Sequence, residues 1–379
     1  MVIEQLPATR KKRRLGILCG ITVTAILAAT LWPFNPLPRN KVRWLTEANG
    51  ITFDGAGLVI SDEPLRTEED RTQQACTLEL LLRPAAMKSL YTILSFYTPN
   101  RPGQFLVRQW TDGLLVSHDV ADDRNKIKRR KIDVDHAFEV GKILLVTIVS
   151  GPNGTTVYKN GRQAKFFRTF TISRNELSGQ IVMGTSPVEY QPWLGEVRGL
   201  AIYSKGLTPA QVFEHYKAWT DGSGVNPSEP DTVALYRFTE RAGNKLHNAA
   251  HGGPDLEIPR NFTVPHKALL TSPVKEFQAS WGYVKDILLN VGGFVPLGFV
   301  VCAYLALGRS RGKAIFFTIF AAGMLSIAIE VLQAYIPRRV SGTTDIITNT
   351  LGATLGAALA RPGGVRRFLG LLGRDTISQ

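Results

Sequence analysis

The chain has 379 residues, of which 44% are hydrophobic and 20% are charged, and its formal net charge at pH 7 is +14. This composition excludes wholesale disorder, and the length predicts two or three domains. Of the three cysteines, only Cys76 lies outside a strongly apolar segment. The sequence therefore predicts neither an internal disulfide nor a cysteine zinc site in the soluble part.

The first apolar window spans residues 15–32 without a charge and follows the basic run Arg10–Arg14. A basic flank before such a window is also typical of a signal peptide, and residues 28–30 offer a weak cleavage site. The residues directly after it, from Leu31 to Phe34, are typical of a helix that ends at a membrane interface. We therefore expect a retained transmembrane helix, with a cleaved signal peptide as the alternative.

The long segment after this window has the pattern of many short strands. Apolar stretches are bounded by Gly, Pro and Asn, and Asn160-Gly161 is a tight-turn signal. A short helix is expected at residues 211–219, with Thr208 as its N-cap and Pro209 at its first position. The expected strands lie at residues 50–60, 76–84, 91–97, 104–110, 113–116, 142–149 and 155–159. Strands at this spacing predict a β-sandwich.

Ligand binding is the role expected of this sandwich, because it contains no recognisable catalytic pattern. Trp110, Tyr190 and Trp193 are the aromatic residues that could stack on sugar rings. Aromatic residues of this kind are equally typical of a core or of a rim, so both interpretations stay open.

Other polar features of the sandwich have simpler interpretations. Glu79 and Glu196 are isolated acids on expected strands and are predicted to be solvated. The basic run 124–131 is predicted to be a solvated sheet edge, with contact to anionic lipids or envelope polymers as the alternative. Oxygen-rich turns suit calcium, but no ligand spacing requires it, so we predict no metal and no other cofactor. The calcium candidates are Asp54, Asp112, Asp122 and Asp123.

Three further apolar windows follow at residues 287–307, 314–336 and 343–360. Each can cross a hydrocarbon layer of about 30 Å as a helix, the last one only barely. Gly352 and Gly356 have the GxxxG spacing that allows helices to pack closely.

The basic clusters fall on one side of the membrane if all four windows span it, which predicts that both chain termini are cytoplasmic. Residues 33–285 then face outward; they hold 31 Lys and Arg against 26 Asp and Glu. Most of the net charge is therefore a topology signal and does not predict nucleic-acid binding. The clusters are residues 10–14, residues 309–313, and Arg361, Arg366, Arg367 and Arg374.

Polar residues at helical spacing lie at similar depth near the outer ends of the last three windows. Acidic side chains at such a depth are costly and nearly always face a bundle interior, with a partner. The pairs are Asp286 with Asn290, Glu330 with Gln333, and Asp345 with Asn349, while Arg338 and Arg339 lie in the loop between the last two windows. We expect one polar pocket in which the arginines partly neutralise the carboxylates; a network that serves only helix packing is the alternative.

Several ordered motifs in these windows carry a resemblance to a known family. They are Asp286-Ile-Leu-Leu-Asn290, Phe294-Val-Pro-Leu-Gly298, Glu330-Val-Leu-Gln333, Ile336-Pro-Arg-Arg339 and Asp345-Ile-Ile-Thr-Asn349-Thr-Leu-Gly352-Ala, together with Trp32-Pro-Phe-Asn35. The chain resembles the VanZ-like family of bacterial membrane proteins over residues 10–38 and 282–362. This resemblance implies four spans in the cytoplasmic membrane of a bacterium. The founding member of the family is associated with resistance to the glycopeptide antibiotic teicoplanin.

A second resemblance covers the sandwich. Its motifs are Phe53-Asp-Gly55, Thr77-Leu-Glu-Leu-Leu-Leu-Arg-Pro84, Val157-Tyr-Lys-Asn-Gly161, Trp193-Leu-Gly-Glu-Val-Arg198 and Leu207-Thr-Pro-Ala-Gln211. Together they resemble the concanavalin A-like, laminin-G-like domains, which implies a jelly-roll fold and a carbohydrate ligand. Residues 233–240 resemble a strand that such domains often carry at their start, so a circularly shifted strand is expected to close the sandwich.

The predicted fold is a four-helix transmembrane bundle with an all-β concanavalin A-like sandwich inserted between helices one and two. The predicted parts are a cytoplasmic N-terminus (1–14), the first transmembrane helix (15–32), the extracytoplasmic sandwich with its linkers (33–281), transmembrane helices two to four (282–362) and a cytoplasmic tail (363–379).

Two functions fit this organisation. The first is an envelope protein that binds a glycan or glycoconjugate outside and presents the polar pocket to a lipid-linked ligand. The alternative is a membrane enzyme in which Glu330 or Asp345 acts as acid or base and Arg338 and Arg339 hold a phosphate. Membrane lipid is the expected partner in both cases, and the sequence does not predict an oligomeric state.

Overall fold

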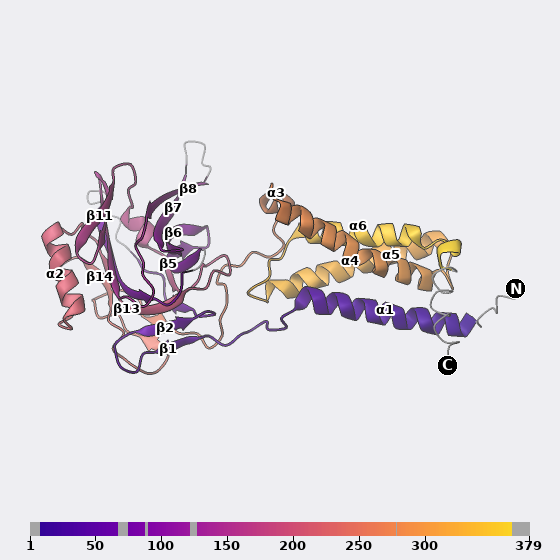
Figure 1. Cartoon of the computed structure of the whole chain (residues 1–379), viewed down its shortest axis with the longest axis horizontal. Coiled ribbons are helices and arrows are strands. Elements are labelled where there is room, and N and C mark those ends of the chain that lie inside the picture. Colours follow the sequence, from indigo (N-terminus) through magenta and orange to yellow (C-terminus); the bar gives the residue numbers. More distant parts are fainter. Residues whose placement is uncertain (1–7, 67–74, 88–89, 122–126, 278, 366–379) are drawn as a thin grey trace. The chain divides into compact units, whose positions relative to one another are not determined.

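The computed structural model describes residues 8–66, 75–87, 90–121, 127–277 and 279–365. The chain divides into two compact units: Met1–Pro36 joins Ala268–Gln379 in one, and Leu37–Lys267 forms the other. The first unit is helical and the second is built of strands (Figure 1). The sandwich is therefore an insertion after the first helix, as the sequence predicts.

One layer of the sandwich, which we call the first sheet, has the strand order β1-β2-β13-β4-β9-β10-β11, and β14 also pairs with β13. Its strands are antiparallel: β1 (Val42–Trp44), β2 (Ile51–Asp54), β13 (Leu194–Tyr203), β4 (Cys76–Pro84), β9 (Leu144–Gly151), β10 (Gly154–Lys159), β11 (Arg162–Phe167) and β14 (Thr232–Tyr236). Asn160 and Gly161 have positive φ values of 51° and 73° and form the predicted tight turn between β10 and β11.

The other layer, the second sheet, has the order β15-β16-β3-β12-β5-β6-β7-β8. Its strands are β15 (Lys245–Leu246), β16 (Leu256–Glu257), β3 (Val59–Ser61), β12 (Gln180–Met183), β5 (Tyr91–Thr98), β6 (Arg101–Trp110), β7 (Gly113–Ala121) and β8 (Ile127–Val134). The short 3-10 helix η1 (Arg174–Leu177) precedes β12. Residues 127–131 of the basic run belong to β8, which lies at the edge of this sheet, while Arg124 lies outside the described residues.

The core lies between the two sheets because each strand alternates its side chains between two faces. Leu78 and Leu80 on β4 of the first sheet and Phe105 and Val107 on β6 of the second belong to the same buried cluster. The central strands are the predicted apolar stretches, so burial of these faces is what the sequence pattern already indicates. Strand β14 contains the start of the segment 233–240 and pairs with β13, as the expectation of an additional closing strand requires.

The chain enters and leaves the sandwich through paired segments. Arg39 forms an isolated antiparallel bridge with Asn261. Asn40 donates its backbone N–H to the carbonyl of Arg260 at 3.1 Å, and Phe262 donates to Pro38 at 2.8 Å. These segments hold the two ends of the insertion together.

Helix α2 (Pro209–Thr220) packs on the first sheet, on the face away from the main core. Thr208 accepts a hydrogen bond from the backbone of Gln211, and Pro209 occupies the first turn, so both predicted N-terminal signals are confirmed.

The helical unit contains α1 (Ala8–Leu31), α3 (Pro273–Glu276), α4 (Trp281–Leu305), α5 (Arg311–Ala334) and α6 (Thr343–Leu359). Helices α1, α4 and α5 are long and apolar enough to cross a membrane. Helix α6 has 17 residues and falls short of that length. The four predicted windows are all helical, but the described residues support three candidate spans instead of four. Of the predicted basic C-terminal cluster, Arg366, Arg367 and Arg374 lie outside the described residues.

Candidate functional site

The predicted polar residues of the helical unit meet at the end of the unit where α6 begins. Asn290 on α4 donates to Asp345 on α6 at 2.7 Å, and Asn349 one turn further along α6 donates to Ser326 on α5 at 2.9 Å. Gln333 on α5 donates to the carbonyl of Thr30 in α1 at 3.0 Å. Each polar contact therefore ties two different helices together.

Glu330 is 1% exposed, and its carboxylate accepts the backbone N–H of Gly342 at 2.7 Å. Glu276 accepts the backbone N–H of Thr344 at 3.1 Å and also the hydroxyl of Thr344. Both acceptor contacts come from the first residues of α6. Since the N-terminus of a helix carries unsatisfied N–H groups and partial positive charge, it compensates the buried carboxylate of Glu330 and the partly buried one of Glu276.

Arg339 in the loop before α6 plays a different part from the one expected. Arg339 donates to the carbonyl oxygen of Trp32 at 2.7 Å and to that of Ala29 at 3.2 Å, so it caps the C-terminal end of α1. Its described hydrogen bonds go to main-chain carbonyls, which corrects the prediction that this arginine neutralises a membrane carboxylate. Arg338 and Asp286 are exposed.

Close packing brings α4 and α6 together. A side chain added at Gly352 would overlap the carbonyl of Val291, and one added at Gly298 would overlap the backbone of Ala353. The glycines therefore allow direct contact between the two backbones, as the GxxxG spacing predicts. This contact aligns Asn290 with Asp345.

The three aromatic ligand candidates of the sandwich have different surroundings. Trp110 is 52% exposed at the end of β6, and the ammonium group of Lys131 lies 6.0 Å from its ring centroid. Tyr190 is partly exposed and packs edge-on against Phe262 at 5.7 Å between ring centroids. Trp193 is fully buried and donates its indole N–H to Gln109 at 2.8 Å. Of the two interpretations left open for Trp193, burial favours the core residue over the ligand-stacking ring.

Trp110 belongs to a polar face of the second sheet. Because Phe105, Val107, Leu114 and Val116 point into the core, the alternate residues of β6 and β7 point away from it. The strand register places side chains of β8 beside them. We call this surface the β6–β8 face; its polar and aromatic residues are Arg108, Trp110, Ser117, Asp119, Arg129, Lys131 and Asp133.

Arg108 is the least solvated cation of the β6–β8 face. It is 9% exposed, and its Nε has no hydrogen-bond partner among the described residues. Burial and the nearby charge of Arg129 lower the pKa of Arg108, while Glu189 and Asp119 oppose that shift. A guanidinium nevertheless stays charged at neutral pH, so the face holds a poorly compensated buried cation.

Other groups of the face are already paired. Arg129 forms a two-point contact with Asp119, with distances of 2.8 and 3.2 Å from its Nε and Nη2. A side chain at Gly103 would overlap this ion pair, so the pair lies flat against β6. Ser117, two residues before Asp119 on β7, is not paired: its hydroxyl is buried and has no hydrogen-bond partner in the described chain.

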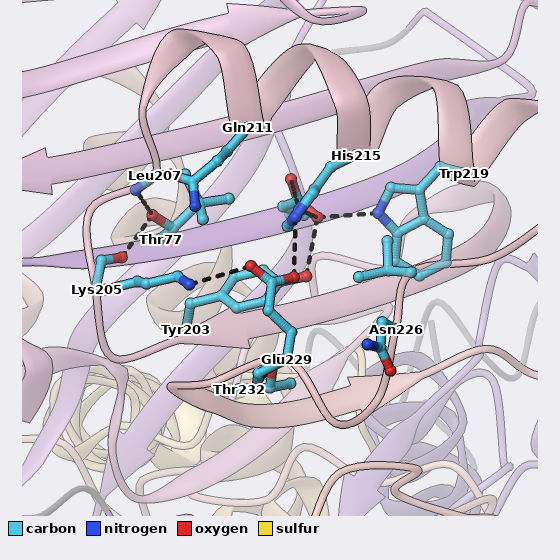
Figure 2. A network of polar contacts seen from close by, with 12 residues as sticks. Thr77, Tyr203, Lys205, Leu207, Gln211, His215, Trp219, Asn226, Glu229 and Thr232 are labelled. Carbon is cyan, nitrogen blue, oxygen red and sulfur yellow. Dashed lines mark hydrogen bonds and ion pairs between the residues drawn. The ribbon is translucent and has the colours of Figure 1, made fainter.

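The densest polar network of the sandwich lies under α2 and was not expected from the sequence. Glu79 on β4 is fully buried and accepts hydrogen bonds from Trp219 at 3.0 Å, from His215 at 3.2 Å and from Tyr203 at 3.3 Å. Figure 2 shows His215 and Trp219 pointing from the helix toward the strands. The prediction that Glu79 is solvated is therefore wrong.

His215 connects this carboxylate to a second one. Its Nε2 lies 3.0 Å from Glu229, whose other oxygen is 3.1 Å from the ammonium group of Lys205 (Figure 2). Burial alone would lower the pKa of His215, but hydrogen bonding and attraction to Glu79 and Glu229 outweigh it and raise that pKa. Burial and the charge of Glu79 raise the pKa of Tyr203, which stays a neutral donor.

The arrangement under α2 resembles catalytic networks in composition but not in access. Both Glu79 and Tyr203 are fully buried, and His215 is nearly so. This polar network fastens α2 to the first sheet. The helical spacing of Gln211, His215 and Trp219, four residues apart on one face, is the sequence signal that could have located it.

Two of the acidic residues considered for calcium have basic side chains beside them. Asp54 lies 3.1 Å from Arg43, and Asp112 lies 2.5 Å from His136. Asp122 and Asp123 lie outside the described residues. Within the described ranges, no group of three or more His, Cys, Asp or Glu side chains could hold a metal ion.

Comparison with known families matches residues 235–367 to the family model described as VanZ/LLP1. The VanZ-like part recognised from the motifs is thereby confirmed. The match begins earlier than residue 282, inside β14, and so includes the last part of the sandwich unit. No curated protein matches the chain.

Solved structures resemble the chain at low identity. A protein from Bacteroides ovatus ATCC 8483, provisionally described as carbohydrate-binding, is 14% identical over 58% of this chain and 62% of its own, with a TM-score of 0.40. The receptor binding domain of botulinum neurotoxin C/D mosaic serotype is 16% identical over 48% of this chain and 45% of its own, with a TM-score of 0.35. The chain thus spans less than two thirds of either structure, and these likenesses carry no inference about a ligand.

Proposed function

We propose that this protein is a bacterial envelope protein in which apolar helices anchor a glycan-binding sandwich outside the cytoplasmic membrane. The observation that carries the proposal is the β6–β8 face. It combines an exposed indole with a guanidinium, a hydroxyl and a carboxylate on adjacent strands. Binding sites for small polar ligands use such a mixture of aromatic surface and a few fixed polar groups.

Trp110 is the residue with which to test glycan binding. The full chain, purified in detergent, is screened against an array of neutral and acidic glycans, and the affinity for the best glycan is then measured for Trp110→Ala. We expect at least a tenfold loss, which corresponds to about 1.4 kcal/mol. Phe166→Ala is the matched control, because Phe166 is an exposed aromatic residue on β11 of the first sheet. Absence of binding to every glycan, or equal effects of both variants, would contradict the proposal.

The helical unit has an anchoring role in this proposal, and its polar end offers hydrogen-bonding groups to a lipid-linked ligand. The enzyme alternative needs Glu330 or Asp345 to reach a substrate. The burial of Glu330 and its bond to Gly342 favour a scaffold instead. Glu330→Gln separates the two: an enzyme loses turnover of a lipid-linked phosphate substrate while the fold stays intact, whereas a scaffold changes only in stability or partner binding.

A further inference from the structure

The β6–β8 face contains polar groups that its own residues leave unsatisfied. The Nε atom of Arg108 and the hydroxyl of Ser117 are both buried, and neither has a hydrogen-bond partner in the described part of the chain. Arg108 pairs in register with Leu115, and Ser117 pairs with Leu106, so the two polar side chains are diagonal neighbours on one face. Buried polar groups without partners are uncommon and call for a ligand or a water.

The nearest carboxylates do not supply the missing partner. Both oxygens of Asp119 are engaged by Arg129. Glu189 accepts from the side chain of Gln191 at 2.6 Å and is exposed. These two acids attract Arg108 electrostatically without forming a hydrogen bond or ion pair with it among the described residues.

The segment from Glu189 to Pro192 borders this face. Thr92, the register partner of Arg108 on β5, donates its hydroxyl to the side chain of Gln191 at 3.0 Å. Pro192 forms an isolated bridge with Thr92. Arg108 therefore lies between the bordering segment and the β7 side chains, with Trp110 two residues along the same strand.

We propose that the glycan bound at the β6–β8 face is acidic, and that its carboxylate or phosphate group lies on the guanidinium of Arg108. This inference rests on the proposed function and names the class of its ligand. The planar guanidinium fork matches carboxylate and phosphate oxygens, which accept two parallel hydrogen bonds. The sugar ring of the ligand contacts the exposed ring of Trp110.

The charge of the face agrees with an anionic ligand. Three cations, Arg108, Arg129 and Lys131, face three acids, Asp119, Asp133 and Glu189. Asp119 is paired with Arg129, and Asp133 lies 3.7 Å from Lys165. Arg108 is thus a cation without an ion-pair partner among the described residues, and an anionic sugar supplies that partner whereas a neutral sugar does not. Contact with Arg108 also restores hydrogen bonding to a cation whose burial is costly.

The experiment compares three ligands on the full chain in detergent: an oligogalacturonate, its uncharged methyl ester and a phosphate-substituted mannan. Affinities are measured at constant ionic strength for the natural protein and for Arg108→Gln, Arg108→Lys and Trp110→Ala. Arg162→Gln is the charge-matched control, because Arg162 is an exposed residue on β11 of the first sheet. Thermal unfolding of each variant verifies that it is folded.

We expect Arg108→Gln to weaken binding of an acidic ligand at least tenfold, and Arg108→Lys to restore only part of the affinity because lysine has no fork. Arg162→Gln should change affinity less than twofold. The acidic ligand that binds identifies the group as carboxylate or phosphate.

The outcomes separate the inference from the function on which it rests. Equal binding of the methyl ester and the acid, with loss in Trp110→Ala, overturns the acidic ligand and keeps glycan binding. Equal losses in Arg108→Gln and Arg162→Gln overturn the assignment to Arg108 and indicate general charge attraction. Failure of all three ligands to bind overturns the acidic ligand; glycan binding itself then falls only if the glycan array is negative too.

Discussion

The two units of this protein bury carboxylates in different ways. In the sandwich, Glu79 is neutralised by side chains, above all by His215, which in turn contacts Glu229. In the helical unit, Glu330 and Glu276 are held by the backbone N–H groups at the start of α6. The sandwich compensates its carboxylates with side chains of opposite charge, and the helical unit compensates its carboxylates with backbone N–H groups at a helix N-terminus.

This difference follows from what surrounds each carboxylate. The sandwich can gather partners from strands, a helix and a loop, so ionised side chains of both signs meet under α2. The helical unit is built of apolar helices, where each additional charge is costly. A helix N-terminus provides partial positive charge and N–H donors without adding an ion.

The largest effect is expected from Glu79→Gln. This change removes the buried one of the two carboxylates that contact His215, and changes that break a buried ion pair cost about 3–5 kcal/mol. We expect the free energy of unfolding of the sandwich to fall by about 3 kcal/mol, measured by urea unfolding of the full chain with tryptophan fluorescence as the signal. Glu196→Gln is the control; Glu196 pairs with Arg83 and Arg198 but is partly exposed, so a loss below about 1 kcal/mol is expected. Similar losses in both variants would show that the buried Glu79 contributes no more to stability than the partly exposed Glu196.

The helical unit is tested next at its closest contact. Gly352→Ala should destabilise the bundle by about 1–3 kcal/mol, because the added methyl group meets the carbonyl of Val291. Gly292→Ala on α4 is the matched control, since no atom lies within 4 Å of the added carbon. Loss of helical circular dichroism on heating in detergent measures both. A more damaging Gly292→Ala would show that the α4–α6 contact is wrong.

Glu330 tests whether backbone amides compensate a carboxylate. Glu330→Leu leaves the buried N–H of Gly342 without an acceptor and should cost about 1–3 kcal/mol. Glu330→Gln keeps an acceptor oxygen, so a loss below about 1 kcal/mol is expected. Thermal unfolding in detergent, followed by helical circular dichroism, shows which of the two variants is less stable. If Gln is as damaging as Leu, the negative charge itself matters more than the acceptor.

The pH dependence of sandwich stability tests the network under α2. The folded-state pKa of His215 is raised above its ordinary value, so its contribution is fully present below about pH 6.5 and is lost as pH rises through the folded-state pKa. The groups that face it are Glu79, Glu229 and Tyr203, with Lys205 beyond Glu229.

Urea midpoints between pH 6 and 9 should therefore fall more steeply for the natural chain than for His215→Gln. Parallel curves would mean that His215 is neutral in the folded protein.

The smallest effect is expected from Arg339→Gln. A cation at a helix C-terminus contributes about 0.3–1 kcal/mol, and Arg339 caps α1 in this way. A small loss of thermal stability in detergent is expected, without a change in glycan affinity. A loss as large as that of Glu330→Leu would indicate that Arg339 is paired with a buried acid after all.

The sequence was most informative where one segment determines its own structure. Strands β4 and β5 are apolar stretches bounded by proline or turn residues, and α2 begins at its predicted cap. The basic run was predicted as a charged sheet edge, and β8 lies at that edge. The extent of β8 to Val134 was not predicted, because the basic residues conceal the alternation that pairing with β7 reveals.

Partners could not be predicted in the same way. Glu79 and His215 are 136 residues apart, and no pattern within either segment indicates the other. The depth of Glu330 was predicted from its window, but its acceptor contact with Gly342 involves a backbone group, which a side-chain pattern does not contain. The orphaned nitrogen of Arg108 likewise depends on what the neighbouring strands leave unoccupied.

The paired entry and exit segments of the sandwich have a consequence for how such a protein can arise. Because Arg39 lies opposite Asn261, the first and last segments of the insertion lie side by side, however many residues lie between them in the sequence. A loop between two helices can therefore accept such an insertion when its two ends are only as far apart as two adjacent strands. Recombination can therefore exchange one inserted domain for another without redesigning the helices of the host chain.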